Sequence, residues 1–135
     1  MLTFEDVCHA YNPNYDDVYM VNHTPRLNVG VAISFDSNAH MTTDGVSSTI
    51  LASIAEKSGS TLQPFQIRND SRSGGTVGHM LSSATGMRAV DAGIPQLAMH
   101  SIRATTGSLD PGLGVKLFKG FFDHYQSVDA EVSQE

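Results

Sequence analysis

The spacing of apolar residues predicts two main helices. In the first, over residues 46–57, apolar side chains recur every three or four positions and share one helix face: Val46, Ile50, Leu51 and Ile54. Thr43 or Asp44 can cap its start, and Gly59 can stop it. The second helix closes the sequence and carries an apolar stripe made of Leu117, Phe118, Phe121, Phe122 and Tyr125. From Asp129 onward the sequence is polar, and a frayed tail is expected.

Shorter apolar segments predict strands. Residues 29–36 alternate in polarity and are rich in β-branched side chains, which predicts a strand. Four further segments fit short or buried strands: 2–8, 65–68, 87–91 and 97–102. A brief helix over 79–85 is ended by Gly86, while 11–30 predicts an extended loop with a turn at 12–15 (NPNY). Strands that alternate with helices predict an α/β layer architecture.

Composition limits the classes of function. The 135 residues suffice for one ordinary domain, and 40% of them are apolar, enough to bury a core. Fourteen acidic against eight basic residues give a net charge of −6, which disfavours nucleic acid and membrane surfaces as partners. No apolar run approaches the ~20 residues of a membrane-spanning helix, and the start of the sequence lacks the layout of a signal peptide. The single cysteine, Cys8, excludes an internal disulfide and a cysteine-based zinc site.

Two places in the sequence hold candidate metal ligands. Asp6 and His9 stand in FEDVCHAYNPNY, where the residues alone favour a turn or capping carboxylate for Asp6. His100 lies in GIPQLAMHSIR, an otherwise apolar run, where an unpaired buried imidazole would be costly. A lone histidine on an apolar strand is by default a structural residue, so both interpretations of His100 stay open. Three other histidines lack partners at metal-ligand spacing and read as surface or structural residues: His23, His40 and His124.

A polar, glycine-rich turn, RNDSRSGGTVG, covers residues 68–78. Because it precedes a predicted helix, the N–H groups of Gly74, Gly75 and Thr76 can face an anion or a peptide carbonyl. The alternative is a structural turn in which the glycines only permit a positive φ. The residues alone favour that alternative.

These segments together resemble the C-terminal half of the catalytic domain in the aspartyl/vacuolar aminopeptidase family, which are dinuclear zinc exopeptidases. The resemblance covers nearly the whole sequence. It implies an α/β fold, the C-terminal portion of a three-layer zinc-peptidase catalytic domain with a mixed β-sheet flanked by helices. That portion would span residues 1–128, followed by a polar tail at 129–135. SRSGGT, RATTGS and LGVKLFKGFF are most similar to the fungal vacuolar branch.

The resemblance also implies roles for individual residues. Asp6, in a segment similar to D-x-x-H-x-x-x-P-N-[YF], matches a terminal ligand of one zinc, and His100, in M-H-S, matches the imidazole ligand of the second. Asp91 is a candidate hydrogen-bond partner for His100. The residues expected on the substrate side are His9, Gly74, Gly75, Thr76 and Met99. The implied cofactor is zinc, two ions per intact active site, and the implied substrates are peptides.

The activity of the family needs residues that this sequence does not contain. In the family a bridging aspartate, one histidine, a glutamate ligand and the adjacent base glutamate all lie upstream. The glutamates of this sequence are not adjacent to one another: Glu5, Glu56, Glu131 and Glu135. The expectation is therefore a fragment of a zinc-dependent aminopeptidase that is inactive alone.

Specificity, assembly and location follow from the same resemblance. Acid-preferring members have a lysine where this sequence has Ser34, so neutral, leucine-like N-terminal residues are the expected substrates. They also have a histidine where this sequence has Asn12, so a subunit-interface contribution at that position stays open. The family forms tetrahedral dodecamers, which implies a homo-oligomer, and its vacuolar members reach the vacuole through the cytoplasm. Two other hypotheses stay open. One is a non-catalytic paralogue or scaffold that assembles with intact subunits, and the other is a small α/β protein that binds an anion at the glycine turn.

Overall fold

The computed structural model of the chain describes residues 7–75 and 77–133. Its helices are α1 (Gly45–Ser58), α2 (Val77–Thr85) and α3 (Asp110–Val132), together with a short 3₁₀ helix, η1 (Pro13–Val18). Its strands are β1 (Cys8–His9), β2 (Val31–Phe35), β3 (Leu62–Gln66), β4 (Ala92–Gly93) and β5 (Pro95–Gln96).

The main sheet is mixed and has the strand order β3–β2–β4. β2 and β3 run parallel, from the pair Val31–Leu62 to the pair Phe35–Gln66. Parallel neighbours need a long connection, and α1 supplies it. β4 joins the other edge of β2 in the antiparallel direction, and a separate parallel pair joins β1 to β5. Sheets with flanking helices confirm the predicted α/β class.

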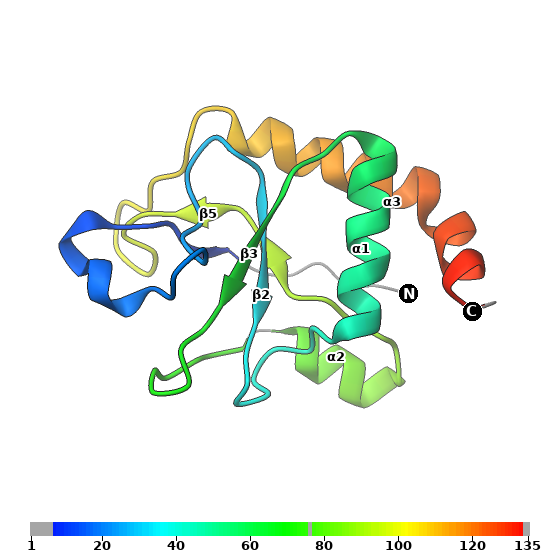
Figure 1. The fold of residues 1–135 in the computed structure, drawn as a ribbon, viewed down its shortest axis with the longest axis horizontal. Helices are drawn as coiled ribbons and strands as arrows, with labels where there is room; N and C mark the ends of the chain where they lie inside the picture. Colours follow the sequence, from blue (N-terminus) through cyan, green and yellow to red (C-terminus); the bar gives the residue numbers. More distant parts are fainter. Residues whose placement is uncertain (1–6, 76, 134–135) are drawn as a thin grey trace.

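The helices and the loops occupy different sides of the molecule. In Figure 1, α1 and α3 lie on one side of the β2–β3 pair, whereas η1 and the loops around β5 lie on the other. The buried apolar core is made by side chains of β2, α1, β4 with the segment before it, and α3: Val31, Ile33, Ile50, Leu51, Ile54, Ala55, Val90, Ala92, Leu117, Phe121 and Val128. No helix among the described residues is both long and apolar enough to cross a membrane.

α1 begins and ends where the sequence predicts. The Asp44 carboxylate accepts a hydrogen bond from the Ser47 N–H at 2.6 Å, and the Ser47 hydroxyl accepts one from the Asp44 N–H at 2.9 Å. This capping box satisfies N–H groups at the helix start. Gly59 follows the helix in the left-handed conformation, with φ of 62°. Thr43, the other candidate cap, instead accepts a bond from the Asp91 N–H at 2.9 Å.

α3 packs against α1, but only part of its predicted apolar stripe is buried. Leu117 and Phe121 lie in the core, whereas Phe118 and Phe122 are exposed. The two helices approach closely at Gly120, where an added Cβ would lie 2.5 Å from the Cβ of Ser58. A glycine is therefore needed there for the helices to touch.

The C-terminal part of α3 differs from the prediction of a frayed tail. The helix continues to Val132, and Val128 is fully buried. Val132 is also packed against the core, and Lys57 on α1 forms an ion pair with Glu131 at 2.7 Å. The sequence looks polar from Asp129 because only every fourth residue faces the core. The prediction is thus wrong for residues 129–132.

Several predicted strands are displaced. The segment 87–91 precedes the observed β4: Ala89 and Val90 are buried, but the described ladder starts only at Ala92. The strand predicted over 65–68 is the end of β3, which begins earlier, at Leu62. Of the strand predicted over 2–8, residues 2–6 lie outside the described part, and β1 begins at Cys8. These segments are apolar because they are buried. The bounds of a strand depend in addition on where its neighbouring strands run, which the sequence does not show.

Candidate active-site pocket

A pocket of about 770 Å³ lies beside β1, β2 and β3. Most of its wall comes from four segments that are distant in sequence: 7–19, 65–68, 71–75 and 98–100. These segments lie on the side of the sheet away from α1 (Figure 1). The pocket brings together five residues predicted for the site: His9, Gly74, Gly75, Met99 and His100. Two others, Asp6 and Thr76, lie outside the described residues.

His9 is placed by the pairing of β1 with β5. Its register partner is Gln96, and the Ala10 N–H donates to the Gln96 carbonyl at 2.8 Å. Gln96 stands just before the turn that carries His100, so the pairing brings the two histidines to neighbouring parts of the pocket wall. Partial burial, and secondly the nearby charge of His100, lower the pKa of His9. The His9 imidazole is therefore neutral at neutral pH and can accept as well as donate a hydrogen bond.

His100 lies on an exposed turn, and the prediction of a buried strand over 97–102 is wrong. Leu97 and Thr105 exchange two backbone hydrogen bonds of 2.8 and 2.9 Å, so the chain reverses between them. Ala98 and His100 both have a positive φ, 53° and 67°, which costs free energy in residues other than glycine. Such strain concentrates at functional sites. The His100 imidazole is thus presented on an open part of the pocket wall rather than buried.

Aromatic side chains form an apolar part of the pocket. Tyr19, which follows η1, lies against Phe65 of β3 with ring centroids 6.5 Å apart. The Tyr19 hydroxyl donates to the Ala10 carbonyl at 2.8 Å, which ties the loop after β1 to the same wall. Burial raises the pKa of Tyr19, so its hydroxyl stays neutral. This part of the pocket suits an uncharged ligand group.

Two arginines of the glycine-rich turn, Arg68 and Arg72, also line the pocket and were not predicted. Arg68 forms a bidentate ion pair with Asp70, at 2.8 and 2.5 Å, and also donates to the Asp17 carbonyl. The hydrogen bonds from Arg68 lower the pKa of Asp70. Arg72 is exposed and has no ion-pair partner among the described residues. Both arginines are visible in the segment RNDSR, but the charge of a residue does not indicate whether its side chain faces a cavity.

A family model for "Aminopeptidase I zinc metalloprotease (M18)" matches residues 1–122 of this sequence. The chain belongs to the M18 aminopeptidase family. The predicted resemblance is thereby confirmed at the level of the family, and the matched range includes every residue that lines the pocket.

Relatives of this M18 chain are much longer than the chain itself. Vacuolar aminopeptidase 1 of Saccharomyces cerevisiae is 54% identical over 129 residues, which is 96% of this chain and 25% of the relative. Aspartyl aminopeptidase of Aspergillus oryzae is 41% identical over 133 residues, 94% of this chain and 27% of the relative. The S. cerevisiae mApe1 dodecamer is a structural match with a TM-score of 0.84 and 52% identity, covering 93% of this chain and 27% of that one. The chain thus spans about a quarter of the length of these relatives.

Ser34 and Asn12 of this M18 chain both line the pocket. Ser34 on β2 is buried, and its N–H donates to the Asp91 carbonyl at 2.8 Å. Asn12 stands before η1, where its side chain accepts a hydrogen bond from the Asn14 N–H at 3.0 Å. A different side chain at either position would therefore change the lining of this pocket.

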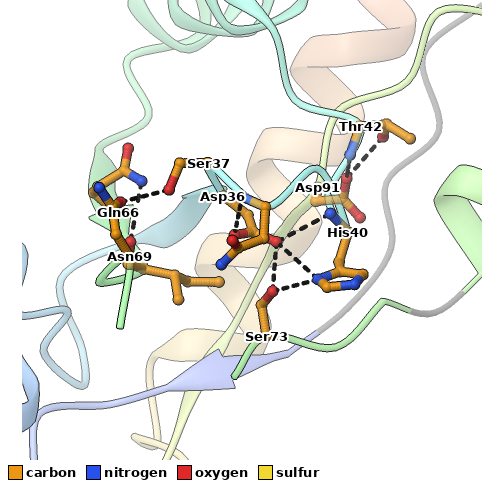
Figure 2. Close-up of polar contacts among 10 residues, drawn as sticks. Asp36, Ser37, His40, Thr42, Gln66, Asn69, Ser73 and Asp91 are labelled. Carbon is orange, nitrogen blue, oxygen red and sulfur yellow. Dashed lines mark hydrogen bonds and ion pairs between the residues drawn. The ribbon is translucent and has the colours of Figure 1, made fainter. Parts of the chain in front are cut away.

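The described residues of this M18 chain do not complete a zinc site by themselves. Among residues 7–75 and 77–133, no three His, Cys, Asp or Glu side chains gather closely enough to hold a metal ion. A catalytic zinc takes three protein ligands, and the pocket offers the imidazoles of His9 and His100. The buried Asp91 carboxylate accepts bonds from the Thr42 N–H and Oγ1 at 2.5 and 2.7 Å (Figure 2), and within the described part it forms no bond to His100. The expected pairing of Asp91 with His100 is therefore wrong here.

Proposed function

We propose that this chain forms one wall of the active site of a zinc-dependent aminopeptidase that releases neutral, leucine-like residues from the N-terminus of peptides. The observation that supports this most strongly is the pocket itself. His9, Met99 and His100 lie around one cavity together with the Gly74–Gly75 turn, although these segments are far apart in the sequence. The family resemblance implies site roles for these same residues, and unrelated loops would not be expected to bring them together by chance.

The proposed roles follow the chemistry of each side chain. His100 is proposed as the ligand of one zinc and Asp6 as a ligand of the other. The open, strained turn at His100 supports its role, because an imidazole that binds metal needs free access to one ring nitrogen. His9, neutral at neutral pH, is proposed to contact the substrate, with Met99 packing beside it. The N–H groups of Gly74, Gly75 and Thr76 are proposed to face the peptide backbone.

The lining of the pocket supports a preference for neutral side chains. Ser34 carries no charge where an acidic ligand group would need a cation, and Tyr19 and Phe65 add apolar surface. The charge of Arg68 is offset by Asp70. Arg72 remains, but it is exposed, and solvent weakens an ion pair at such a place. An acidic substrate side chain therefore gains little from the described lining.

The 135-residue chain alone is expected to be inactive. Its sequence holds no adjacent pair of glutamates, so the glutamate ligand and base glutamate of the family have no counterpart in it. A general base must lie within hydrogen-bond reach of the attacking water. Purified chain supplied with zinc is expected to show no hydrolysis of leucine anilide above the metal-only control. Robust hydrolysis would contradict this.

A chimera tests the function. In yeast vacuolar aminopeptidase 1, the segment that this chain matches over 129 residues is replaced by this chain. The chimera is expected to hydrolyse leucine anilide in a zinc-dependent way, with kcat/KM at least about tenfold above that for the aspartate analogue. His100→Ala is expected to abolish the activity, whereas His124→Ala, on α3, is the matched control and leaves it unchanged.

Each contrary outcome has a distinct meaning. A chimera that folds and assembles but does not hydrolyse peptides would overturn the enzyme proposal and favour a non-catalytic scaffold. An active chimera that prefers the aspartate substrate would overturn only the neutral preference. Activity that survives His100→Ala would overturn the ligand role of His100.

Assembly and location are proposed by analogy with the relatives. The yeast relative is named a vacuolar enzyme, and its mApe1 structure is a dodecamer. We expect the complete protein to form a homo-oligomer, a tetrahedral dodecamer, and to act on peptides in the vacuole. Neither nucleic acid nor membrane is expected as a partner, given the net charge of −6. Light scattering of the chimera checks the oligomer, and vesicle and DNA pull-downs check the excluded partners.

A further inference from the structure

A cluster of polar side chains lies directly behind the glycine-turn wall of the pocket. The Ser73 hydroxyl donates to Asp36 Oδ2 at 2.6 Å, and His40 Nδ1 lies 2.6 Å from the same hydroxyl (Figure 2). The two oxygens of Asp36 also accept the N–H groups of His40, at 3.0 Å, and Asn38, at 2.9 Å. The Asp36 side chain is fully buried, so water competes little for these bonds. They join the loop after β2 to the turn after β3.

The hydrogen-bond pattern assigns the protons in this cluster. Burial opposes ionisation of Asp36, but the bonds from Ser73, Asn38 and His40 outweigh it and lower the pKa of the carboxyl. The carboxylate is therefore ionised at neutral pH and acts only as an acceptor. Ser73 has one hydroxyl proton and donates it to Asp36. The proton in the contact between His40 and Ser73 must then sit on His40 Nδ1, so the network assigns the tautomer of His40.

The same three residue types occur in serine hydrolases, but their order here excludes that chemistry. In a catalytic triad the imidazole stands between the carboxylate and the hydroxyl, and it accepts the serine proton. In this cluster the Ser73 hydroxyl donates directly to Asp36 Oδ2, and the same ring nitrogen, His40 Nδ1, faces both the hydroxyl, at 2.6 Å, and Asp36 Oδ2, at 3.4 Å. The Ser73 proton is held by Asp36, and His40 Nδ1 donates toward the Ser73 oxygen. The imidazole cannot activate Ser73, so the cluster acts by holding the turn in place.

Gly75 extends the contact between the turn and the loop. A Cβ added to Gly75 would lie 2.5 Å from the His40 carbonyl oxygen and 2.8 Å from His79 Nδ1. The carbonyl belongs to the backbone and cannot swing away, so any larger residue would push the turn off the loop. Ser73 is therefore held by hydrogen bonds and Gly75 by close backbone contact. Both residues line the pocket.

We propose that Asp36 and His40 are positioning residues that clamp the Ser73–Gly75 turn against the loop after β2, and so fix the pocket wall that receives the substrate backbone. The effect on catalysis rests on the proposed function of the pocket, whereas the clamp itself does not. Ser73 is half-buried, and Gly74 and Gly75 are exposed. A turn with so little buried surface needs directional bonds to keep one conformation.

The clamp is tested first on the full 135-residue chain, without any assay of activity. Backbone ¹⁵N relaxation is measured for Gly74 and Gly75 in the native chain and in Ser73→Ala. The order parameters are expected to fall from about 0.85 to below about 0.6 in Ser73→Ala, and by less in His40→Ala, which leaves the bond from Ser73 to Asp36 in place. Ser48→Ala, a serine on α1 that bonds only within its own helix, is the matched control and leaves both values unchanged. Unchanged order parameters in Ser73→Ala would overturn the clamp.

The catalytic consequence is tested in the chimera with yeast vacuolar aminopeptidase 1. Ser73→Ala is expected to raise KM about tenfold while kcat stays within about twofold, because the wall binds the peptide backbone in both ground and transition states. Ser73→Thr keeps the hydroxyl and is expected to restore KM. A loss of general stability would lower the amount of active enzyme and leave KM unchanged.

The outcomes separate this inference from the proposed function. If the chimera without further substitutions is inactive, the proposed function is contradicted. The relaxation data on the 135-residue chain then still test whether the clamp exists. An active chimera with an unchanged KM in Ser73→Ala overturns the positioning role. A rise in KM that Ser73→Thr does not reverse would show that the hydroxyl is not the cause, and it would also overturn the proposal.

Discussion

The side of the molecule that holds α1 and α3 and the side that holds the pocket are stabilised in different ways. The helical side buries apolar side chains such as Leu51 and Ile54 completely. The pocket side consists mostly of loops, and many of its long-range contacts are hydrogen bonds, several of them to buried carboxylates. Apolar contact is roughly proportional to area and has little directionality, whereas hydrogen bonds require a fixed geometry. The helical side therefore supplies stability, and the pocket side supplies the positions of particular atoms.

Three aspartates with buried side chains show how the loops are held to the rest of the fold. Each accepts N–H or hydroxyl groups from a loop that is remote in sequence or follows a strand: Asp36 from Ser73 and His40, Asp91 from Thr42, and Asp110 from Asn28, Thr106 and Gly107. A buried carboxylate with several donors is stable, but removal of it leaves those donors unpaired. The conformation of the loops thus depends on a few hydrogen-bonded residues, whereas the stability of the core is shared among many apolar side chains.

The largest expected effect is a change in the helical core. Leu51→Ala is expected to lower the free energy of unfolding by about 3 kcal/mol, because Leu51 is fully buried and the truncation leaves a cavity. Urea denaturation of the full chain measures it. Val46→Ala is the control on the same helix, since Val46 is 41% exposed, and its effect is expected to stay below about 0.5 kcal/mol. Equal effects of the two changes would contradict the assignment of the core face.

A smaller effect is expected from the buried carboxylate between the loops and α3. Asp110→Ala leaves the N–H groups of Asn28 and Gly107 without their acceptor, at 2.8 Å each, and is expected to cost about 2 kcal/mol. The loss is expected to appear mainly as faster amide exchange in 26–30 and 105–109, with α1 little changed. Asp123→Ala, an exposed carboxylate on the same helix, is the control. If amide exchange in Asp110→Ala became faster to the same extent across the whole chain, the two sides would not be stabilised separately.

A still smaller loss of stability is expected at the start of α1. Asp44→Ala removes the acceptor for the Ser47 N–H and is expected to cost about 1 kcal/mol, as is typical of helix caps. Thr43→Ala removes the hydroxyl that bonds to Asp91 and is not expected to change α1. The two variants are compared by thermal unfolding and by the chemical shifts of α1. If the chemical shifts of α1 changed more in Thr43→Ala than in Asp44→Ala, Thr43 and not Asp44 would be the helix cap.

The smallest effect is expected from acid. The pKa of Asp36 is lowered in the folded chain, below its ordinary value of 3.8. The stabilisation from its carboxylate is therefore fully present above that ordinary value and is lost as pH falls through the lowered folded-state value. The Gly74 and Gly75 amide signals are expected to show a shift in strong acid, as pH falls through that lowered value. In Asp36→Asn that acid shift is expected to disappear, and its persistence would assign it to another group.

The elements of the helical side could largely be predicted, because their signals are local. Asp44 caps the start of α1 and Gly59 caps its end, and both residues were among the predicted candidates. The strand predicted over 29–36 is observed as β2. The error at the C-terminus, where α3 continues to Val132, arises because burial of Val128 depends on a core built by distant residues.

The pocket side was harder to predict, since its signals are non-local. The apolar letters around His100 fit a buried strand, but pairing of Leu97 with Thr105 makes them a turn, in which Ile102 is 99% exposed. His40 reads as a surface residue, and only the approach of Ser73 shows that it holds the glycine turn. Residue type alone carries no information on such partners.

The sequence by itself determined the α/β class, the first helix, the family, and five of the residues that line the pocket. Helix periodicity and capping act within a few residues, and family motifs are short, so all of these can be read along the chain. Only the tertiary structure decided that His100 is exposed on a strained turn, that Asp91 bonds to Thr42, and that Asp36 holds the wall at Ser73. These depend on loops that meet across the fold, where one hydrogen bond of defined geometry joins residues that no local pattern connects.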